Sequence, residues 1–151
     1  MKTFDGKNHY ITIIVIKTSK SNLNYFYISH SNSEMRAKAI AIIDDEVDLV
    51  NLFQEALESD GYKVCAFIDP IQALNTVEKK IQEYGLILSD YRMPKLNGYE
   101  LCTKLIQLNP NLEVILMSAY DSLECDTSKY TLIKKPVLIA QLLQIVRDNL
   151  E

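Results

Sequence analysis

The sequence is poor in cysteine and has no long apolar run, and each shortage narrows what the protein can be. Its 151 residues include three cysteines, Cys65, Cys102 and Cys125, which are too few and too far apart for a disulfide framework or a paired metal knuckle. We interpret them as small buried hydrophobic residues or as bystanders, in a reduced, cytoplasmic protein. The longest apolar run near the start, residues 10–16, is too short to span a membrane and has no secretory cleavage site, so we expect no membrane association.

Acidic residues outnumber basic residues over most of the chain. The net charge is −4, but residues 1–34 hold +2, so the remaining residues hold −6. An acidic body of this kind argues against a nucleic-acid partner bound through phosphates. The composition, 48% hydrophobic and 24% charged, is that of one ordinary globular domain.

From residue 38 onward, short runs typical of strands alternate with segments of helical periodicity. Residues 39–43 are continuously apolar, as expected of a strand buried on both faces. The helix predicted over 47–59 is followed by Gly61, a favoured residue after a helix end, and Asp69 with Pro70 predicts the next helix start. The other strands are predicted over 63–68, 86–89, 114–117 and 131–134, and the other helices over 99–108 and 138–150.

This order of elements predicts βαβ units and a parallel sheet. Because crossover connections are right-handed, the predicted fold class is α/β, a doubly wound five-stranded parallel sheet with strand order 2-1-3-4-5. Residues 118–130, between the last two strands, contain few apolar positions, so the fourth helix should be short or irregular.

The first 35 residues do not share this rhythm, so we predict an N-terminal extension, residues 1–35, and one domain, residues 36–151. Residues 10–16 could add an edge strand, whereas residues 19–33 are rich in Ser and Asn and indicate loop or disorder. Met35 stands where the first strand of the domain would naturally begin. We therefore hypothesise that the extension is upstream sequence read in frame and contributes little to the fold.

Acidic side chains follow two of the predicted strands. Asp44 and Asp45 come directly after 39–43, and Asp90 comes directly after 86–89. The carboxyl ends of parallel strands meet at one edge of a sheet. Two carboxylates about 4 Å apart repel by roughly 4 kcal/mol at an effective dielectric near 20, so a cation would stabilise their convergence. Such oxygen ligands suit Mg²⁺, but adjacent acids after a strand are also common in solvated turns and helix starts, so both interpretations stay open here.

Two further strand ends carry polar groups that a phosphoryl group needs. Ser118 follows 114–117, and Lys135 with Pro136 follows 131–134. A hydroxyl and an ammonium at the same sheet edge as Asp90 offer charge-assisted donors to phosphoryl oxygens. Each alone is commonplace, because Ser is a frequent turn former and a surface Lys is usually solvated.

Four of the five predicted strand ends therefore carry an acid pair, an acid, a hydroxyl and Lys-Pro, in that order. At this point the chain resembles the receiver domain of two-component response regulators, over roughly residues 37–150. The resemblance implies a flavodoxin-like receiver fold with Asp90 as the phosphoacceptor. It also implies Mg²⁺ as cofactor, bound by Asp45 and Asp90, by Asp44 through water, and by the backbone carbonyl of Arg92.

The resemblance further implies roles for the last two strand ends. Ser118 would hydrogen-bond a phosphoryl oxygen, Lys135 would pair with the phosphoryl group, and Pro136 would follow a cis peptide bond. By that similarity the protein is a phosphoacceptor switch and not an enzyme, with at most slow self-dephosphorylation. Its partner would be a sensor histidine kinase or a phosphotransfer protein. The new charge on Asp90 would shift the loop after 114–117 between two arrangements.

The sequence departs from the family pattern at two places. The family usually has an aromatic switch residue three positions before the lysine, where this chain has Leu132, and Tyr130 lies two residues earlier. Arg92 and Tyr120 stand two residues after the acceptor and two after the hydroxyl, positions that in this family flank the path of the hydrolytic water. Their bulk predicts a long-lived phosphoryl group.

We expect a single-domain response regulator that signals through protein contacts, since no residues follow the last helix that could form a DNA-binding motif. The sequence names no output partner and leaves open whether a homodimer forms on phosphorylation. A receiver-like module that docks constitutively without phosphorylation is the alternative, favoured by Leu132 and by the short fourth helix. A phosphatase of the haloacid dehalogenase type would need a second acid where this chain has Arg92.

Overall fold

The five predicted strands form one parallel sheet. The computed structural model describes residues 2–4, 10–19, 22–30, 38–120, 123 and 126–150 of the chain. The sheet has the order β5-β4-β6-β7-β8, which is 2-1-3-4-5 counted along the chain from β4. Its strands are β4 (Ala39–Ile43), β5 (Val64–Phe67), β6 (Tyr84–Asp90), β7 (Glu113–Ser118) and β8 (Thr131–Lys134). This order confirms the predicted doubly wound α/β fold.

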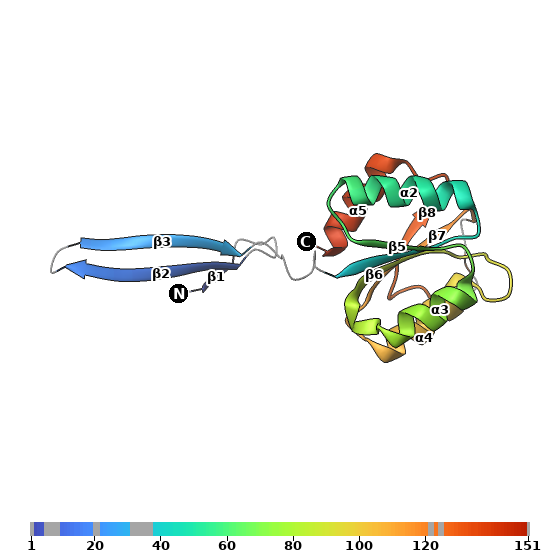
Figure 1. Ribbon diagram of the computed structural model, residues 1–151, viewed down its shortest axis with the longest axis horizontal. Helices are drawn as coiled ribbons and strands as arrows, with labels where there is room; N and C mark the ends of the chain where they lie inside the picture. The colour runs from blue at the N-terminus through green and yellow to red at the C-terminus, as the bar shows by residue number, and fades with distance from the viewer. Residues whose placement is uncertain are drawn as a thin grey trace.

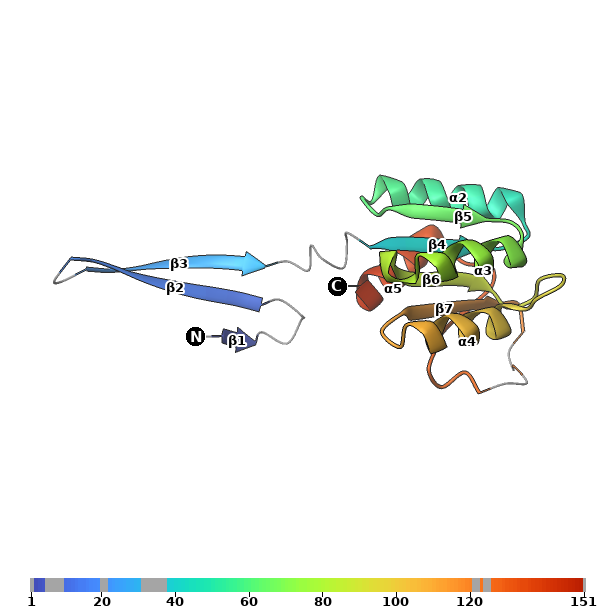
Figure 2. The ribbon, with the colours of Figure 1, turned by 60° about the horizontal axis from the view of Figure 1, so that its bottom comes forward.

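Helices cover both faces of the sheet (Figures 1 and 2). In the described residues they are α2 (Val47–Ser59), α3 (Pro70–Lys79), α4 (Gly98–Leu108) and α5 (Ile139–Leu150), with one 3₁₀ turn, Ile81–Glu83. The pair α2 and α5 lies on one face, and the pair α3 and α4 lies on the other (Figure 1). Because all neighbouring strands of this sheet are parallel, their carboxyl ends lie at one common edge.

The core has two halves, one on each face of the sheet. The strands β4 and β6 are buried along their whole length, as their continuous apolar runs predict. On one face, Phe53 and Leu57 of α2 pack in the same cluster as Leu142 of α5 and the alternate sheet residue Ile40. Burying each such side chain contributes about 1.5–3 kcal/mol. The resulting rigid sheet fixes the positions of the residues at its edge.

Local helix signals behave as the sequence predicts. The carboxylate of Asp69 caps α3, because its Oδ1 accepts hydrogen bonds from the backbone N–H groups of Ile71 at 2.9 Å and Gln72 at 3.0 Å. Pro70 is the first residue of this helix. Gly61 follows α2 with a φ of 91°, a conformation that glycine adopts without a steric penalty.

The connection between β7 and β8 contains no helix in its described residues, 119, 120, 123 and 126–130. Residues 128 and 129 form a turn, in which the backbone N–H of Tyr130 donates to the carbonyl of Thr127 at 2.9 Å. The prediction of a short or irregular fourth helix is consistent with this described part. The remaining residues of the connection, 121, 122, 124 and 125, lie outside the described residues.

The N-terminal segment differs from its prediction. The strands β1 (Lys2–Phe4), β2 (Tyr10–Ser19) and β3 (Asn22–His30) form an antiparallel sheet of their own, in the order β1-β2-β3. The interpretation of residues 19–33 as loop or disorder is therefore wrong for 22–30, and residues 10–16 do not join the edge of the parallel sheet. The prediction rested on the Ser and Asn content of residues 19–33. It gave too little weight to their aromatic and β-branched residues, which have high strand propensity. The division of the chain at residue 35 stays a prediction.

None of the described helices is long enough and apolar enough to cross a membrane.

Candidate functional site

The functional candidates lie at the carboxyl edge of the parallel sheet. Asp44 follows β4, Asp90 ends β6, Ser118 ends β7 and Lys135 follows β8. Because all four strands are parallel neighbours, their ends bring these side chains to one rim. The predicted convergence of residues separated widely in the sequence is therefore a feature of the structure.

Three carboxylates form the acidic part of this rim. Asp44, Asp45 and Asp90 each offer an oxygen, and these oxygens lie within 4.8 Å of one another. Asp44 is fully buried and Asp90 is nearly so, with 7% of its surface exposed, whereas Asp45 is exposed. The Oδ1 of Asp44 accepts a hydrogen bond from the backbone N–H of Glu46 at 2.9 Å, which fixes its orientation.

Lys135 is the cation of the site. Its Nζ lies 2.8 Å from Asp44 Oδ2 and 2.9 Å from Asp90 Oδ1, with its side chain only 14% exposed. Burial works to lower the pKa of this ammonium, but the hydrogen bonds to Asp44 and Asp90 outweigh burial and raise the pKa above its usual range. The lysine is therefore charged at any physiological pH. The Lys135–Pro136 peptide bond is cis, as the family resemblance implies.

The same surroundings have opposing effects on the pKa of the Asp90 carboxyl. Burial raises the pKa of the Asp90 carboxyl above its ordinary value, and the charges of Asp44 and Asp45 add to the rise, whereas Lys135 opposes it. The carboxyl is thus less well stabilised as an anion than an exposed aspartate. A divalent cation in addition to Lys135 would further favour the ionised, nucleophilic form of Asp90.

The chemistry of the donor set fits a hard divalent ion. Three carboxylates within reach of one point supply the oxygen ligands that Mg²⁺ prefers, and the exposed side of Asp45 leaves room for water ligands. Asp44, Asp45 and Asp90 would hold the ion. The backbone carbonyl of Arg92 as a fourth protein ligand stays a prediction, and so do the individual roles of all these residues.

Ser118 is linked to two residues that the sequence analysis treated separately. Its Oγ accepts a hydrogen bond from the backbone N–H of Tyr120 at 3.1 Å, and the hydroxyl itself is nearly buried. The Nη1 of Arg92 donates to the hydroxyl of Tyr120 at 3.1 Å, and the guanidinium carbon lies 4.1 Å from the centre of the tyrosine ring. Arg92 and Tyr120 therefore form one contact between the loops after β6 and β7, which sequence alone did not predict.

Two residues near the site were missed by the sequence analysis. Glu46 Oε1 lies 3.4 Å from Lys135 Nζ, so a third acid shares the lysine. Gly98 begins α4 so close to the end of β6 that a Cβ there would lie 2.0 Å from the backbone oxygen of Asp90 and 2.8 Å from Ser89 Oγ. The Asn-Gly pair before a helical run was the only sequence signal for Gly98, and it indicates a turn without revealing this close approach.

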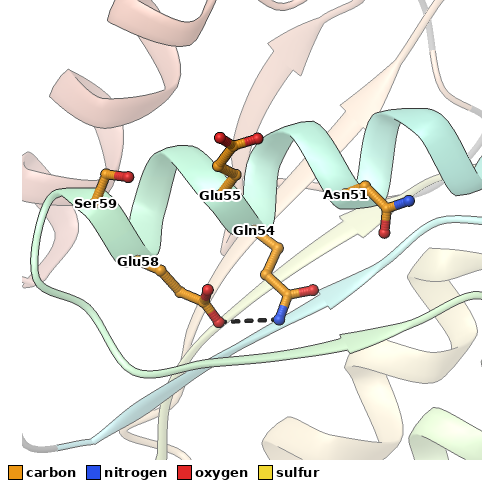
Figure 3. A pocket seen from close by; sticks show the side chains of 5 residues that line it. All are labelled: Asn51, Gln54, Glu55, Glu58 and Ser59. Atoms are coloured by element: carbon orange, nitrogen blue, oxygen red, sulfur yellow. Dashed lines mark hydrogen bonds between the residues drawn. The ribbon is translucent and has the colours of Figure 1, made fainter.

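A surface hollow of about 400 Å³ lies elsewhere, on α2 (Figure 3). A single helix supplies all the residues that line it, which are Asn51, Gln54, Glu55, Glu58 and Ser59. Within it the Gln54 amide donates to Glu58 Oε1 at 2.9 Å. It contains none of the carboxylates of the rim, so it is a polar surface feature separate from the Asp90 site.

Comparison with known protein families matches residues 40–147 to the response regulator receiver domain. The chain belongs to this family. Among solved structures, the receiver domain protein (CheY-like) from Methanospirillum hungatei JF-1 is similar to it, with a TM-score of 0.69 and 29% identity, over 75% of this chain and 93% of that one. The fold, the strand order and the family thus agree.

Curated relatives place the receiver domain in different contexts. Sporulation initiation phosphotransferase F of Bacillus subtilis is 30% identical over 90 residues, covering 60% of this chain and 71% of that protein. The C4-dicarboxylate transport transcriptional regulatory protein DctD of Rhizobium meliloti is 30% identical over 116 residues, covering 74% of this chain but 25% of that protein. The chain spans between 16% and 28% of the length of several such relatives.

Proposed function

We propose that Asp90 accepts a phosphoryl group from a sensor histidine kinase or a phosphotransfer protein, with Mg²⁺ bound beside it, and that the protein acts as a single-domain response regulator through protein contacts. The observation that carries this proposal is the bridge made by Lys135, whose Nζ lies within 2.9 Å of both Asp44 and Asp90. A lysine shared by Asp44 and Asp90 is placed to neutralise the oxygens of a group transferred to Asp90.

In the proposed reaction a carboxylate oxygen of Asp90 attacks the phosphorus of a phosphohistidine. The new P–O bond forms as the P–N bond breaks, and the imidazole of the donor retains the electron pair of that bond. Bound Mg²⁺ supplies charge neutralisation for the phosphoryl oxygens. Lys135 stabilises the same charge from the protein side, so removing its ammonium should slow the transfer more than it weakens donor binding.

Ser118 is proposed to sense the product. Its Oγ accepts from the Tyr120 N–H, and the hydroxyl keeps its own proton for donation to a phosphoryl oxygen on Asp90. Such a bond would pull on the backbone of the loop that follows β7. The charge on Asp90 would thereby become a change of shape at the surface, which an output protein could recognise.

The direct test is phosphorylation of the purified protein with acetyl phosphate and Mg²⁺, followed by measurement of the intact mass. We expect a gain of one phosphoryl group in the wild type and in Asp126→Asn, an exposed aspartate used as the control. Asp90→Asn should show no gain. Equal gains in wild type and Asp90→Asn would refute the assignment of the acceptor.

A second candidate function is a receiver-like module that docks without phosphorylation. The observation that favours it is Leu132, which stands where the family usually has its aromatic switch and is 49% exposed. A pull-down of partners by wild-type protein with and without acetyl phosphate, and by Asp90→Asn, discriminates the two functions. Partner binding that depends on acetyl phosphate in the wild type only supports the switch, whereas identical binding in all three samples supports constitutive docking.

A reduced, cytoplasmic setting remains part of the proposal. Cys65 and Cys102 are both free thiols, which is the usual state in a reducing compartment. We propose no nucleic-acid or membrane partner for the receiver domain, because its charge is acidic.

A further inference from the structure

The loop that follows Asp90, residues 91–97, is fixed at both of its ends by backbone hydrogen bonds. At the start, the N–H of Tyr91 donates to the carbonyl of Met117 at 2.8 Å. At the end, the N–H of Gly98 donates to the carbonyl of Tyr91 at 2.9 Å. These two bonds leave the middle of the loop to be held by other contacts.

Lys95 occupies an unfavourable conformation in the middle of this loop. The N–H of Leu96 donates to the carbonyl of Pro94 at 2.9 Å, and Lys95 between them has a φ of 71°. A three-residue turn with a positive central φ is rare and strained for a residue with a Cβ. Among the described residues, Lys95 is the one non-glycine residue with positive φ. A contact of the Lys95 side chain that favours this conformation would offset the strain.

The side chain of Lys95 makes such a contact with Asp69. Its Nζ lies 2.5 Å from Asp69 Oδ2, and Asp69 is held in turn because its other oxygen, Oδ1, caps α3. The hydrogen bond from Lys95 is also the largest cause of the lowered pKa of the Asp69 carboxyl. The ion pair joins the loop after β6 to the rigid start of a neighbouring helix, 26 residues away in sequence.

We propose that Lys95 and Asp69 are positioning residues that hold the 91–97 loop in the conformation in which Arg92 presents its backbone carbonyl to Mg²⁺ beside Asp90. This inference rests on the proposed function for the metal site. The pair contacts neither the ion nor the phosphoryl group, so its effect is transmitted through the backbone between Arg92 and Lys95. The ion pair offsets part of the strain of the turn at Lys95, and it also ties the loop to the start of α3.

The first test measures Mg²⁺ binding to the unphosphorylated protein by titration of backbone amide chemical shifts. Lys95→Met and Asp69→Asn remove the ion pair, and the asparagine retains the helix cap. We expect both to weaken Mg²⁺ binding by about two- to fivefold, as suits a largely exposed ion pair. Lys95→Arg keeps the cation and should restore wild-type affinity. Lys80→Met, which breaks the exposed Lys80–Glu83 pair, is the matched control and should change nothing.

The second test does not depend on the metal. Amide hydrogen exchange of residues 92–97 should be faster in Lys95→Met and Asp69→Asn than in wild type and Lys80→Met. Lys95→Gly separates strain from anchoring, because glycine adopts positive φ freely but has no ammonium. We expect Lys95→Gly to exchange fast and bind Mg²⁺ weakly, although its turn is unstrained.

Two results would overturn the proposal. Exchange in the loop and Mg²⁺ affinity that are the same in Asp69→Asn, Lys95→Met and wild type would show that the pair positions nothing. Weaker Mg²⁺ binding that Lys95→Arg fails to restore would assign the effect to something other than the ion pair. If the wild type itself bound no Mg²⁺, the proposed function would fail, while the exchange data would still decide whether the pair holds the loop.

Discussion

Gly98 lies against the backbone of Asp90 with no room for a side chain. A Cβ there would lie 2.0 Å from the Asp90 backbone oxygen, and this oxygen belongs to a buried strand that cannot move freely. We predict that Gly98→Ala lowers the free energy of unfolding by at least about 2 kcal/mol, because overpacking a core forces the backbone to shift. Urea unfolding measures this loss.

Gly61→Ala is the matched control for that prediction. Gly61 also has no Cβ, but nothing lies within 4 Å of where one would be, and its φ of 91° makes the substitution strained only in the backbone. We expect this variant to lose about 1 kcal/mol. A Gly98→Ala variant as stable as Gly61→Ala would contradict the close approach to Asp90.

Arg92 and Tyr120 should determine how long a phosphoryl group stays on the protein. Their hydrogen bond and ring contact join the two loops beside Asp90, where they would obstruct a hydrolytic water. We predict that the Arg92→Asn, Tyr120→Ala double variant loses phosphate about tenfold faster, which corresponds to about 1.4 kcal/mol of barrier. Decay of the phosphorylated mass with time measures the rate, with Lys80→Met as control. A double variant that kept its phosphate as long as wild type would disprove the obstruction.

At the scale of elements, the connection between β7 and β8 is anchored to α4 by Tyr130. Its hydroxyl lies 3.0 Å from Thr103 Oγ1, and its ring meets that of Tyr99 edge to face, with centroids 5.8 Å apart. The family's aromatic switch position holds Leu132, which is half exposed. The aromatic residue anchored to α4 is therefore Tyr130, which directly precedes β8, and Leu132 occupies the position where the family usually has its aromatic residue.

We predict that Tyr130 and Thr103 are energetically coupled. In a double-mutant cycle, Tyr130→Phe and Thr103→Val should show a coupling free energy of about 1 kcal/mol, the usual net value of a partly buried hydrogen bond. Chemical unfolding of the four proteins measures it. Strictly additive effects would mean that the contact does not hold the connection to α4.

The elements also show which features are readable from sequence. The strand at 39–43 was predicted with its observed bounds because its continuous apolar run is a local signal, and Asp69 was recognised as a helix cap for the same reason. The strand predicted at 86–89 is longer in the structure, Tyr84–Asp90, and its residues beyond the apolar run are buried as well. The ion pair of Asp69 with Lys95 had no local signal, because two loops far apart in sequence must be folded before the side chains meet.

At the scale of the whole molecule, described residues from Ala39 to Leu150 supply two core clusters, one on each face of the parallel sheet. We predict that a protein lacking residues 1–34 folds with a Tm within about 2 °C of the full chain, because less than about 1 kcal/mol of stability would be lost. Thermal unfolding followed by circular dichroism measures both proteins. A fall of ten degrees or more would show that the N-terminal segment stabilises the domain.

The convergence of four strand ends was predictable from sequence because parallel topology alone brings carboxyl ends together. The distances were not, since the 2.8 Å and 2.9 Å contacts of Lys135 depend on packing across the whole sheet. Residues 22–30 were predicted as loop or disorder because of their polar residues, but they form a strand that pairs with β2.

The central claim is that Asp90 carries the phosphoryl group, and chemical trapping tests it most directly. Borohydride reduces an aspartyl phosphate to homoserine, and peptide mass spectrometry then locates the change after treatment with acetyl phosphate and Mg²⁺. The account predicts homoserine at position 90 in the wild type, and a reduced yield when Lys135 is replaced by Met. Homoserine at any other aspartate, with position 90 unmodified, would contradict it.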